Sequence, residues 1–194
     1  MNDALFLQAI NLLRTCDLQW AVCGGWGIDL FLNRQTRDHK DLDVTVKRAD
    51  QLHMQAFLLS HGWTLEKVAL GKLCTWEQGE YLELPIHNVW CHHPDFPPNY
   101  LEILFSEVDD KQYKFRRNQQ IQLPLERAFL TSASDIPILA PEIILLFKAK
   151  TSNENPDYQQ DFELTLPMLN TAQRGWLKQA IQAVYGSHNW SNSL

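Results

Sequence analysis

The sequence predicts an α+β fold, in which a mixed, largely antiparallel sheet is flanked by helices and followed by a short C-terminal helical part. The first observation is an amphipathic pattern over residues 4–13, followed by the apolar run 20–23, which is typical of a buried strand. The second is a middle third of short apolar runs separated by turn-forming residues. The third is a final third whose apolar residues recur at helical spacing.

The first quarter of the chain predicts a strand, a glycine turn and a helix, followed by a second strand and helix. Gly24 and Gly25 end the first strand, and residues 26–33 are predicted as a helix that begins directly after them. Residues 41–46 alternate between polar and apolar side chains, which indicates a half-buried strand. Residues 49–61 complete this unit with a helix.

The middle third predicts four strands, each bounded by Gly, Pro, Asn or Asp residues. The predicted strands cover residues 72–78, 86–92, 100–107 and 112–116. Because hairpins connect strands that are neighbours in the chain, we expect these strands to join the sheet in antiparallel order.

The last third predicts three helices. Pro141 stands where a first helical turn tolerates proline, and residues 142–150 follow as an apolar helix with lysines at its end. A loop over residues 151–157 is expected next. Two further helices are predicted over residues 161–169 and 171–185.

Thr171 is the expected cap of the last of these helices, and residues 187–194 are expected to fray. The pattern as a whole divides the chain into a catalytic core, residues 1–135, and a C-terminal helical part packed on it, residues 136–194.

Composition limits the classes of protein to which the chain can belong. With 194 residues, 45% of them hydrophobic, the chain is long enough to bury one core. Its net charge of -6 disfavours a surface built for nucleic-acid backbones and fits a cationic or neutral partner better. The four separated cysteines predict reduced thiols rather than disulfides or a zinc site. We expect a cytoplasmic protein, because no signal-like or membrane-spanning apolar run is present.

The strand at residues 41–46 carries the first candidate site. A period of two places Asp41, Asp43 and Thr45 on one face, while the intervening apolar residues face the core. Two converging carboxylates repel each other unless a proton or a cation neutralises them, and Mg²⁺ prefers oxygen ligands of this kind. The alternative is that the pair ends a strand in solvent, beside basic side chains at Arg37, Lys40 and Lys47.

Gly24 and Gly25 form the second candidate site. Glycines let a backbone approach a ligand closely, and the helix that starts behind them presents free N–H groups to a phosphate. The alternative is an ordinary tight turn between strand and helix.

The order of these features resembles the signature of the DNA polymerase β-type nucleotidyltransferase superfamily. Within it, the string GGWGID at 24–29 followed by TRDHKDLD at 36–43 resembles the aminoglycoside 2''-adenylyltransferase and lincosamide nucleotidyltransferase group of antibiotic-modifying enzymes. The strings LAPE at 139–142, KAK at 148–150 and DF at 161–162 resemble C-terminal elements of the same group. The resemblance spans most of the chain and implies the nucleotidyltransferase fold.

The resemblance also implies roles for individual residues. Asp41 and Asp43 correspond to metal ligands, and Gly24-Gly25 to the turn that binds the triphosphate. Arg37 and Lys148 correspond to residues that bind the phosphates.

The third carboxylate of the family would be Glu102, which would also serve as the base, and Glu107 on the same strand is its rival. The alternatives are a solvent-facing strand glutamate for Glu102 and a solvated helix-end lysine for Lys148.

The implied activity is transfer of a nucleoside monophosphate, AMP, from an NTP, ATP, to a hydroxyl of a small-molecule acceptor, assisted by two Mg²⁺ ions. Alternatives left open are a toxin-like nucleotidyltransferase that modifies protein or tRNA, and a catalytically silent nucleotide-binding module. Neither the acceptor nor antibiotic resistance follows from the sequence. The chain is not expected to contact membrane or nucleic acid, and a homodimer stays open.

Two other polar clusters have simpler interpretations. His87, Cys91, His92 and His93 are spaced like metal ligands, but adjacent strand residues point to opposite faces, so we interpret them as structural. Arg116-Arg117 could bind phosphate or line a sheet edge, and we favour the sheet edge.

Overall fold

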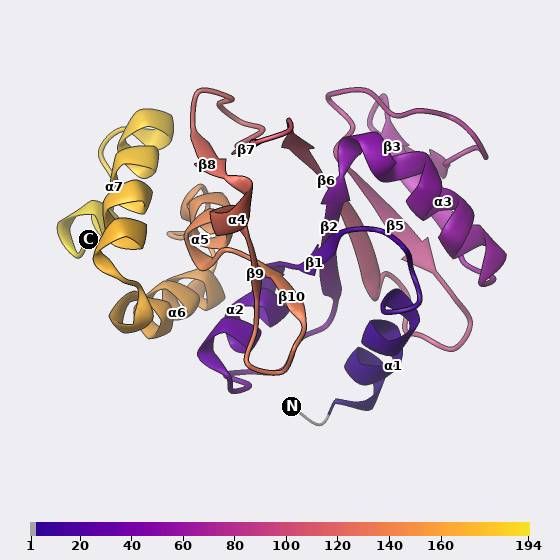
Figure 1. Ribbon diagram of the computed structural model, residues 1–194, viewed down its shortest axis with the longest axis horizontal. Helices are drawn as coiled ribbons and strands as arrows, with labels where there is room; N and C mark the ends of the chain where they lie inside the picture. The colour runs from indigo at the N-terminus through magenta and orange to yellow at the C-terminus, as the bar shows by residue number, and fades with distance from the viewer. Residues whose placement is uncertain (1–2) are drawn as a thin grey trace.

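The computed structural model describes residues 3–194, in which a mixed ten-stranded sheet separates two groups of helices (Figure 1). The main path of the sheet runs β4-β3-β5-β6-β2-β1-β10-β9, and β7 and β8 extend from β6. The strands are β1 (Trp20–Val22), β2 (Leu42–Lys47), β3 (Thr64–Ala69), β4 (Lys72–Thr75), β5 (Asn88–His92), β6 (Leu101–Val108), β7 (Gln112–Lys114), β8 (Gln122–Pro124), β9 (Phe129–Thr131) and β10 (Pro137–Leu139). The helices are α1 (Ala4–Leu13), α2 (Gly24–Leu32), α3 (Gln51–Ser60), α4 (Leu125–Ala128), α5 (Pro141–Ala149), α6 (Pro156–Thr165) and α7 (Thr171–Tyr185).

Two apolar clusters hold these layers together. In one cluster, α1 and α3 pack on the face of β2 and β6 that presents Leu42, Val44 and Ile103. In the other, α5, α6 and α7 pack against one another and against β10 and the segment around β7. Helix α2 contributes Trp26 to the first cluster and Ile28 to the second, so it lies where they meet. The opposite face of β2 and β6, which carries Asp43, is left free for a site.

The strand order corrects the expectation of consecutive antiparallel hairpins. Strand β6 pairs with β2 in parallel, and β10 pairs with β1 in parallel, although each pair is far apart in the sequence. The β3–β4 and β5–β6 pairs are antiparallel as expected. Strands β3, β8, β9 and β10 were not predicted, because three of them have only three residues and β3 has no strict alternation.

The glycine segment also differs from its prediction. Helix α2 begins at Gly24, so both glycines belong to its first turn, whereas the sequence predicted a helix that starts after them. Gly24 has a φ of 60°, a conformation that favours glycine, and Cys23 precedes it as the N-cap without a side-chain hydrogen bond. The N–H groups of the first turn are therefore not capped by a side chain.

The C-terminal helices are displaced from their predicted bounds. Helix α6 begins at Pro156 behind an Asn155 cap, inside the predicted loop, because a proline at the first helical position is a start signal that the pattern analysis missed. Helix α7 matches its predicted range, but its cap is Asn170 in a capping box with Gln173, not Thr171.

The prediction of a frayed C-terminus is wrong. Residues Asn189–Asn192 form a 3₁₀ turn, and the Trp190 ring stacks on Phe162 with the ring centroids 4.2 Å apart. Trp190 is buried, so this contact anchors the end of the chain to α6. In residues 3–194, no helix has the length and apolarity needed to cross a membrane.

Candidate active site

The pairing of β2 with β6 brings together two carboxyl groups that are far apart in the sequence. The parallel register places Asp43 beside Glu102, and both point to the face opposite the α1–α3 core. The charge of Glu102 raises the pKa of Asp43, and the Asn88 amide donates to Glu102 Oε1. Glu102 therefore lies on the strand next to that of Asp43.

Glu107, the other candidate for the third carboxylate, is paired with Arg48 and does not lie beside Asp43. Its Oε1 accepts a hydrogen bond from Arg48 Nε at 2.6 Å, and the same guanidinium donates to the carbonyl oxygens of Leu82 and Ile86. Glu107 thus joins β6 to the segment that leads into β5. The register leaves Glu102 as the carboxyl beside Asp43.

Asp41 lies just before β2 and is exposed, so it borders the Asp43–Glu102 pair without joining it. Within residues 3–194, no three acidic, histidine or cysteine side chains form a ready-made metal cluster. Such a cluster is not required for Mg²⁺, which typically binds one or two carboxylates and takes its other ligands from water and substrate phosphates. Asp43, Glu102 and the nearby Asp41 fit that donor set.

Burial and mutual repulsion make this pair electrostatically unfavourable when no cation is bound. Burial, together with the charges of Glu102 and Asp41, raises the pKa of the Asp43 carboxyl to about 7, and the charge of Lys148 opposes this shift. Burial also raises the pKa of Glu102, and the Asn88 hydrogen bond opposes that shift. A divalent cation would remove the repulsion, which is why the residues present fit such an ion.

The glycines allow the backbone to lie directly against these side chains. A Cβ atom at Gly24 would lie 1.9 Å from Asp43 Oδ2, which is an impossible contact. A Cβ at Gly25 would lie 2.5 Å from His39 Nδ1 and 2.7 Å from Arg37 Nη2. Any side chain at these two positions would therefore displace the carboxylate or the loop that carries Arg37.

Arg37 and Lys148 meet at a shared carboxylate, Asp161 of α6. Lys148 Nζ lies 2.8 Å from Asp161 Oδ2, and Arg37 Nη2 lies 3.7 Å from the same oxygen. Asp161 is fully buried, and Lys148 is almost fully buried with its ammonium 4.2 Å from the centre of the Tyr158 ring. Lys148 is therefore not a solvated helix-end lysine.

Comparison with known proteins gives this arrangement a family context. Residues 5–95 match the sequence profile of the family described as Aminoglycoside-2''-adenylyltransferase. The chain has the nucleotidyltransferase fold. No curated protein matches the chain at a significant level.

Solved structures share this fold at low sequence identity. The crystal structure of ANT(2'')-Ia in complex with adenylyl-2''-tobramycin gives a TM-score of 0.63 at 17% identity, covering 93% of this chain and 97% of that one. The solution structure of the antibiotic-resistance factor ANT(2'')-Ia gives 0.61 at 17% identity, with 93% and 91% covered. Lincomycin-bound lincosamide adenylyltransferase LnuA gives 0.60 at 18% identity, with 84% and 96% covered.

A buried brace, which sequence analysis did not assign, holds the loop between α2 and β2. Both carboxylate oxygens of the fully buried Asp29 are used: Oδ1 accepts from the Thr36 hydroxyl and Oδ2 lies 2.5 Å from His39 Nε2. The His39 ring packs on Trp26 with the centroids 4.5 Å apart. This contact set fixes the loop that places Arg37 beside the glycines. The sequence signal that could have indicated this contact set is Asp29, an acidic residue among the apolar residues of the predicted helix.

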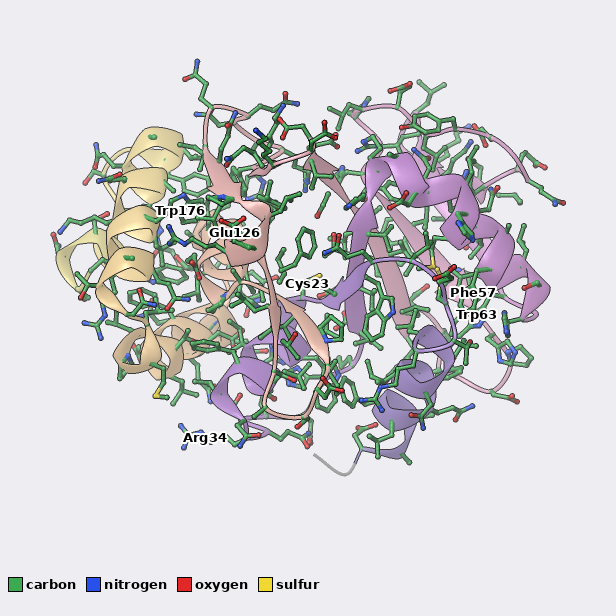
Figure 2. The ribbon with its side chains drawn as sticks, in the orientation of Figure 1. Cys23, Arg34, Phe57, Trp63, Glu126 and Trp176 are labelled. Atoms are coloured by element: carbon green, nitrogen blue, oxygen red, sulfur yellow. The ribbon has the colours of Figure 1, made fainter. Side chains whose placement is uncertain are left out.

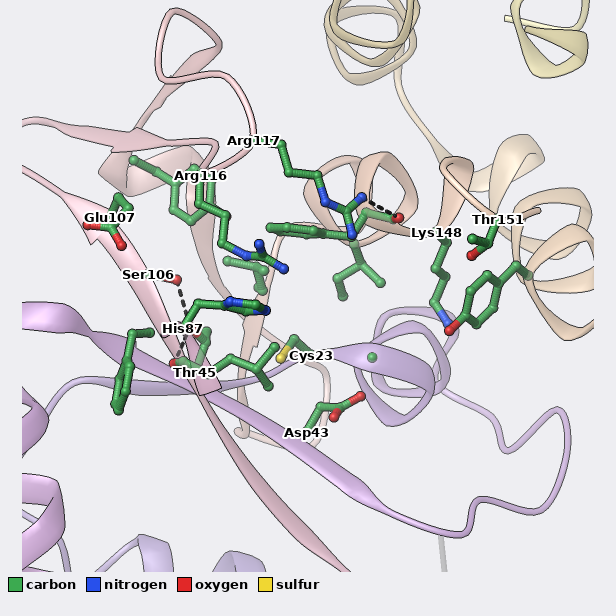
Figure 3. A pocket seen from close by; sticks show the side chains of 18 residues that line it. Cys23, Asp43, Thr45, His87, Ser106, Glu107, Arg116, Arg117, Lys148 and Thr151 are labelled. Atoms are coloured by element: carbon green, nitrogen blue, oxygen red, sulfur yellow. Dashed lines mark hydrogen bonds between the residues drawn. The ribbon is translucent and has the colours of Figure 1, made fainter. Parts of the chain in front are cut away.

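A cavity of about 230 Å³ extends from this site along the sheet (Figure 3). Gly24, Asp43 and Lys148 line one end. The floor includes Thr45 and Ser106, whose hydroxyls hydrogen-bond to each other at 2.6 Å. The other end is basic and contains residues for which sequence analysis preferred a structural role: His87, Arg116 and Arg117.

The remaining histidines are structural, as predicted. His92 Nε2 lies 2.8 Å from Glu66 Oε2, and this contact joins β5 to β3. His93 packs on the Trp63 ring, with the centroids 5.2 Å apart. These rings support β5 and its pairing with β3.

Proposed function

We propose that the protein transfers AMP from ATP to a hydroxyl group of a small-molecule acceptor by in-line displacement at the α-phosphate. One observation carries this proposal: the β2–β6 register sets Asp43 and Glu102 side by side on an open face, directly against the glycines that start α2. Paired carboxyls beside a helix N-terminus are suited to bind a metal-complexed triphosphate.

Each residue has a distinct task in the proposed reaction. Asp43, Glu102 and Asp41 would hold Mg²⁺, which when bound polarises the α-phosphate and neutralises the leaving pyrophosphate. Glu102 is the proposed base, and its carboxylate would accept the proton of the attacking hydroxyl. The Asn88 amide, which donates to Glu102, would orient that carboxylate on the cleft side of β6.

The triphosphate is proposed to bind beside Arg37 and Lys148, two cationic side chains that Asp161 already holds in position. The uncapped N–H groups of the α2 first turn would bind phosphate oxygens, and Arg37 and Lys148 would balance their charge. Because Asp161 contacts both cations, it acts as a positioning residue that keeps them from closing on Asp43 when no nucleotide is bound.

The test is label transfer from ATP, GTP, CTP and UTP carrying ³²P at the α-phosphate, with Mg²⁺ and separate arms of aminoglycosides, lincosamides and cell extract. We expect ATP to be the donor and a small molecule to become labelled. If protein or tRNA becomes labelled in the arm with cell extract, the acceptor is a macromolecule and the proposed small-molecule acceptor is wrong. Absence of transfer together with Mg²⁺-dependent ATP binding would identify a silent nucleotide-binding module.

Glu102→Gln and Glu107→Gln form a matched pair for the base. We expect Glu102→Gln to lower the rate about 10²–10⁴-fold while ATP affinity changes little, because a base acts chiefly in the transition state. Glu107→Gln should retain most of the rate, with a lower melting temperature because Arg48 loses its partner. Equal losses of rate in both variants would remove the base role from Glu102.

A further inference from the structure

The cavity beside the proposed nucleotide site is strongly asymmetric in charge. Asp43 lies on one side, the Arg116 and Arg117 side chains lie on the side opposite Asp43, and Lys148 lies between Asp43 and Arg117 (Figure 3). Only two carboxylates, Asp43 and Glu107, appear among the described residues that line it. Glu107 is paired with Arg48 at 2.6 Å, so it does not pair with the arginines, and the charge of Arg116 acts on Glu102, whose pKa it lowers.

Arg116 forms no direct ion pair in the described residues. In the part of the chain that the structure describes, no carboxylate lies within 4.0 Å of its guanidinium, and that group makes no hydrogen bond. It is half-buried, and it lies 5.5 Å from the centre of the Phe147 ring. Burial lowers the pKa of Arg116, and the charge of Arg117 lowers it further, so the local potential is positive.

Arg117, the neighbouring arginine, differs from Arg116 because its guanidinium makes hydrogen bonds within the protein. Arg117 Nη1 donates to the Phe147 carbonyl oxygen at 3.0 Å and to the Tyr185 hydroxyl at 2.7 Å. These two hydrogen bonds connect the turn that follows β7 to helices α5 and α7. Arg117 therefore has a structural task, whereas Arg116 points toward the cavity with its donors free (Figure 3). A partly buried cation without a partner is costly, and an anionic ligand would offset that cost.

We propose that Arg116 binds a carboxylate or a phosphate group of the acceptor, so that the acceptor is an anionic hydroxyl compound and not a polycationic amino sugar. The inference rests on the proposed function, which assigns Gly24, Asp43 and Lys148 to the nucleotide and leaves the far end for the acceptor. The fork of a guanidinium matches both anions in a bidentate arrangement. A polycation would find Asp43 occupied with metal and Glu107 already paired.

This assignment reverses what the charge of the whole chain favours. A net charge of -6 suits a cationic or neutral acceptor, but a bound molecule responds to the charges that line its own cavity. The hydroxyl pair of Thr45 and Ser106 on the floor adds neutral hydrogen-bonding groups between the two ends. An acceptor with a hydroxyl toward Asp43 and an anion toward Arg116 would span the cavity.

The test measures anion binding with the nucleotide end already filled. Calorimetry with saturating Mg²⁺ and a non-hydrolysable ATP analogue would titrate sulfate as a phosphate mimic, acetate as a carboxylate and tobramycin as a polycation. We expect sulfate or acetate to bind the wild type, and the tighter of the two identifies the anion. Arg116→Gln should weaken that binding at least tenfold, and Arg116→Lys should have an intermediate effect because it keeps charge but loses the fork.

Arg34→Gln is the matched control, because Arg34 is exposed on the loop after α2, away from the cavity, and loses the same charge (Figure 2). Equal anion affinity in the wild type and both Arg116 variants overturns the inference, as does tighter binding of tobramycin than of either anion. Weaker binding of the ATP analogue to Arg116→Gln also overturns it, since Arg116 would then belong to the nucleotide site. Failure of the analogue to bind the wild type refutes the proposed function instead, and sulfate titration without nucleotide still tests Arg116.

Discussion

The two faces of strands β2 and β6 differ in what they contribute to the molecule. On one face Leu42, Val44 and Ile103 are fully buried against α1 and α3. On the other face Asp43 and Glu102 lie side by side. Burial raises the pKa of both, the charge of Glu102 further raises that of Asp43, and the charge of Asp41 further raises that of Glu102. The first face stabilises the folded state, and the second costs free energy unless a cation is bound. Along the same two strands, the residues that face the core stabilise the fold, and the alternating residues that face the cleft carry the proposed chemistry.

The largest expected effect comes from the cleft face. Asp43→Asn should lower nucleotidyl transfer by about 10³-fold or more, because it removes a metal-binding charge at the point where charge develops. It should also abolish the synergy between Mg²⁺ and ATP in calorimetry. The melting temperature without metal should not fall, because the substitution removes a repulsive charge. Near-normal turnover with Mg²⁺ would contradict the metal assignment, and Asp41→Asn is the parallel variant with a smaller effect on stability.

The core face should show the opposite pattern. Ile103→Ala, one residue from Glu102, should lower the free energy of unfolding by about 2–5 kcal/mol, because it leaves a cavity among fully buried side chains. Transfer by the remaining folded protein should stay within a few-fold of the wild type. Urea unfolding and activity measured below the melting temperature test the two halves. A rate loss as large as that of Asp43→Asn would show that the two faces are not separable.

The cleft face was more predictable from sequence than most of the sheet. Strict alternation at residues 41–46 predicted which side chains face the core, since period two is a local property of a strand. The Gly24-Gly25 pair and Asp43 also belong to one short string. Helices α1, α5 and α7 were predicted because their apolar periodicity extends over nine or more residues.

Features that depend on distant partners were not predictable. The parallel pairing of β1 with β10 joins Val22 to Ile138, and a three-residue strand carries too little pattern to reveal its partner. The same holds for Asp161, whose contact with Arg37 and Lys148 depends on how α6 packs against α5. Arg116 illustrates a further limit, because a sequence shows the charge of a residue but not whether it forms a direct ion pair.

Substitution of Asp161 is expected to have an effect of intermediate size on the cleft face. Asp161→Asn should weaken Mg²⁺–ATP binding about tenfold, because Lys148 and Arg37 lose the carboxylate that orients them. It should also lower stability, since a buried lysine is left without its partner. Arg37→Ala combined with Asp161→Asn should weaken ATP binding by less than the sum of the two single effects. Additive effects in calorimetry would mean that Asp161 does not act through Arg37.

The smallest expected effect is a pH dependence of stability that belongs to the cleft face. The pKa of Asp43 is raised from its ordinary value near 3.8 to about 7, so between these values the folded protein binds one more proton than the unfolded chain. Stability from this group is therefore full below about pH 4 and falls as pH rises toward 7. Melting curves in a metal chelator should show Asp43→Asn equal to the wild type near pH 4 and several degrees more stable near pH 8.

Two controls decide whether the pH effect comes from the paired carboxyls. Mg²⁺ at pH 8 should raise the melting temperature of the wild type more than that of Asp43→Asn, because the cation neutralises the same charge. Asp109→Asn should show the opposite trend, since a hydrogen bond from Lys114 lowers the pKa of Asp109 to about 2, and any stability it contributes is lost as pH falls toward that value. A difference between Asp43→Asn and the wild type that stays constant from pH 4 to pH 8 would show that Asp43 is not held in a repulsive, buried pair.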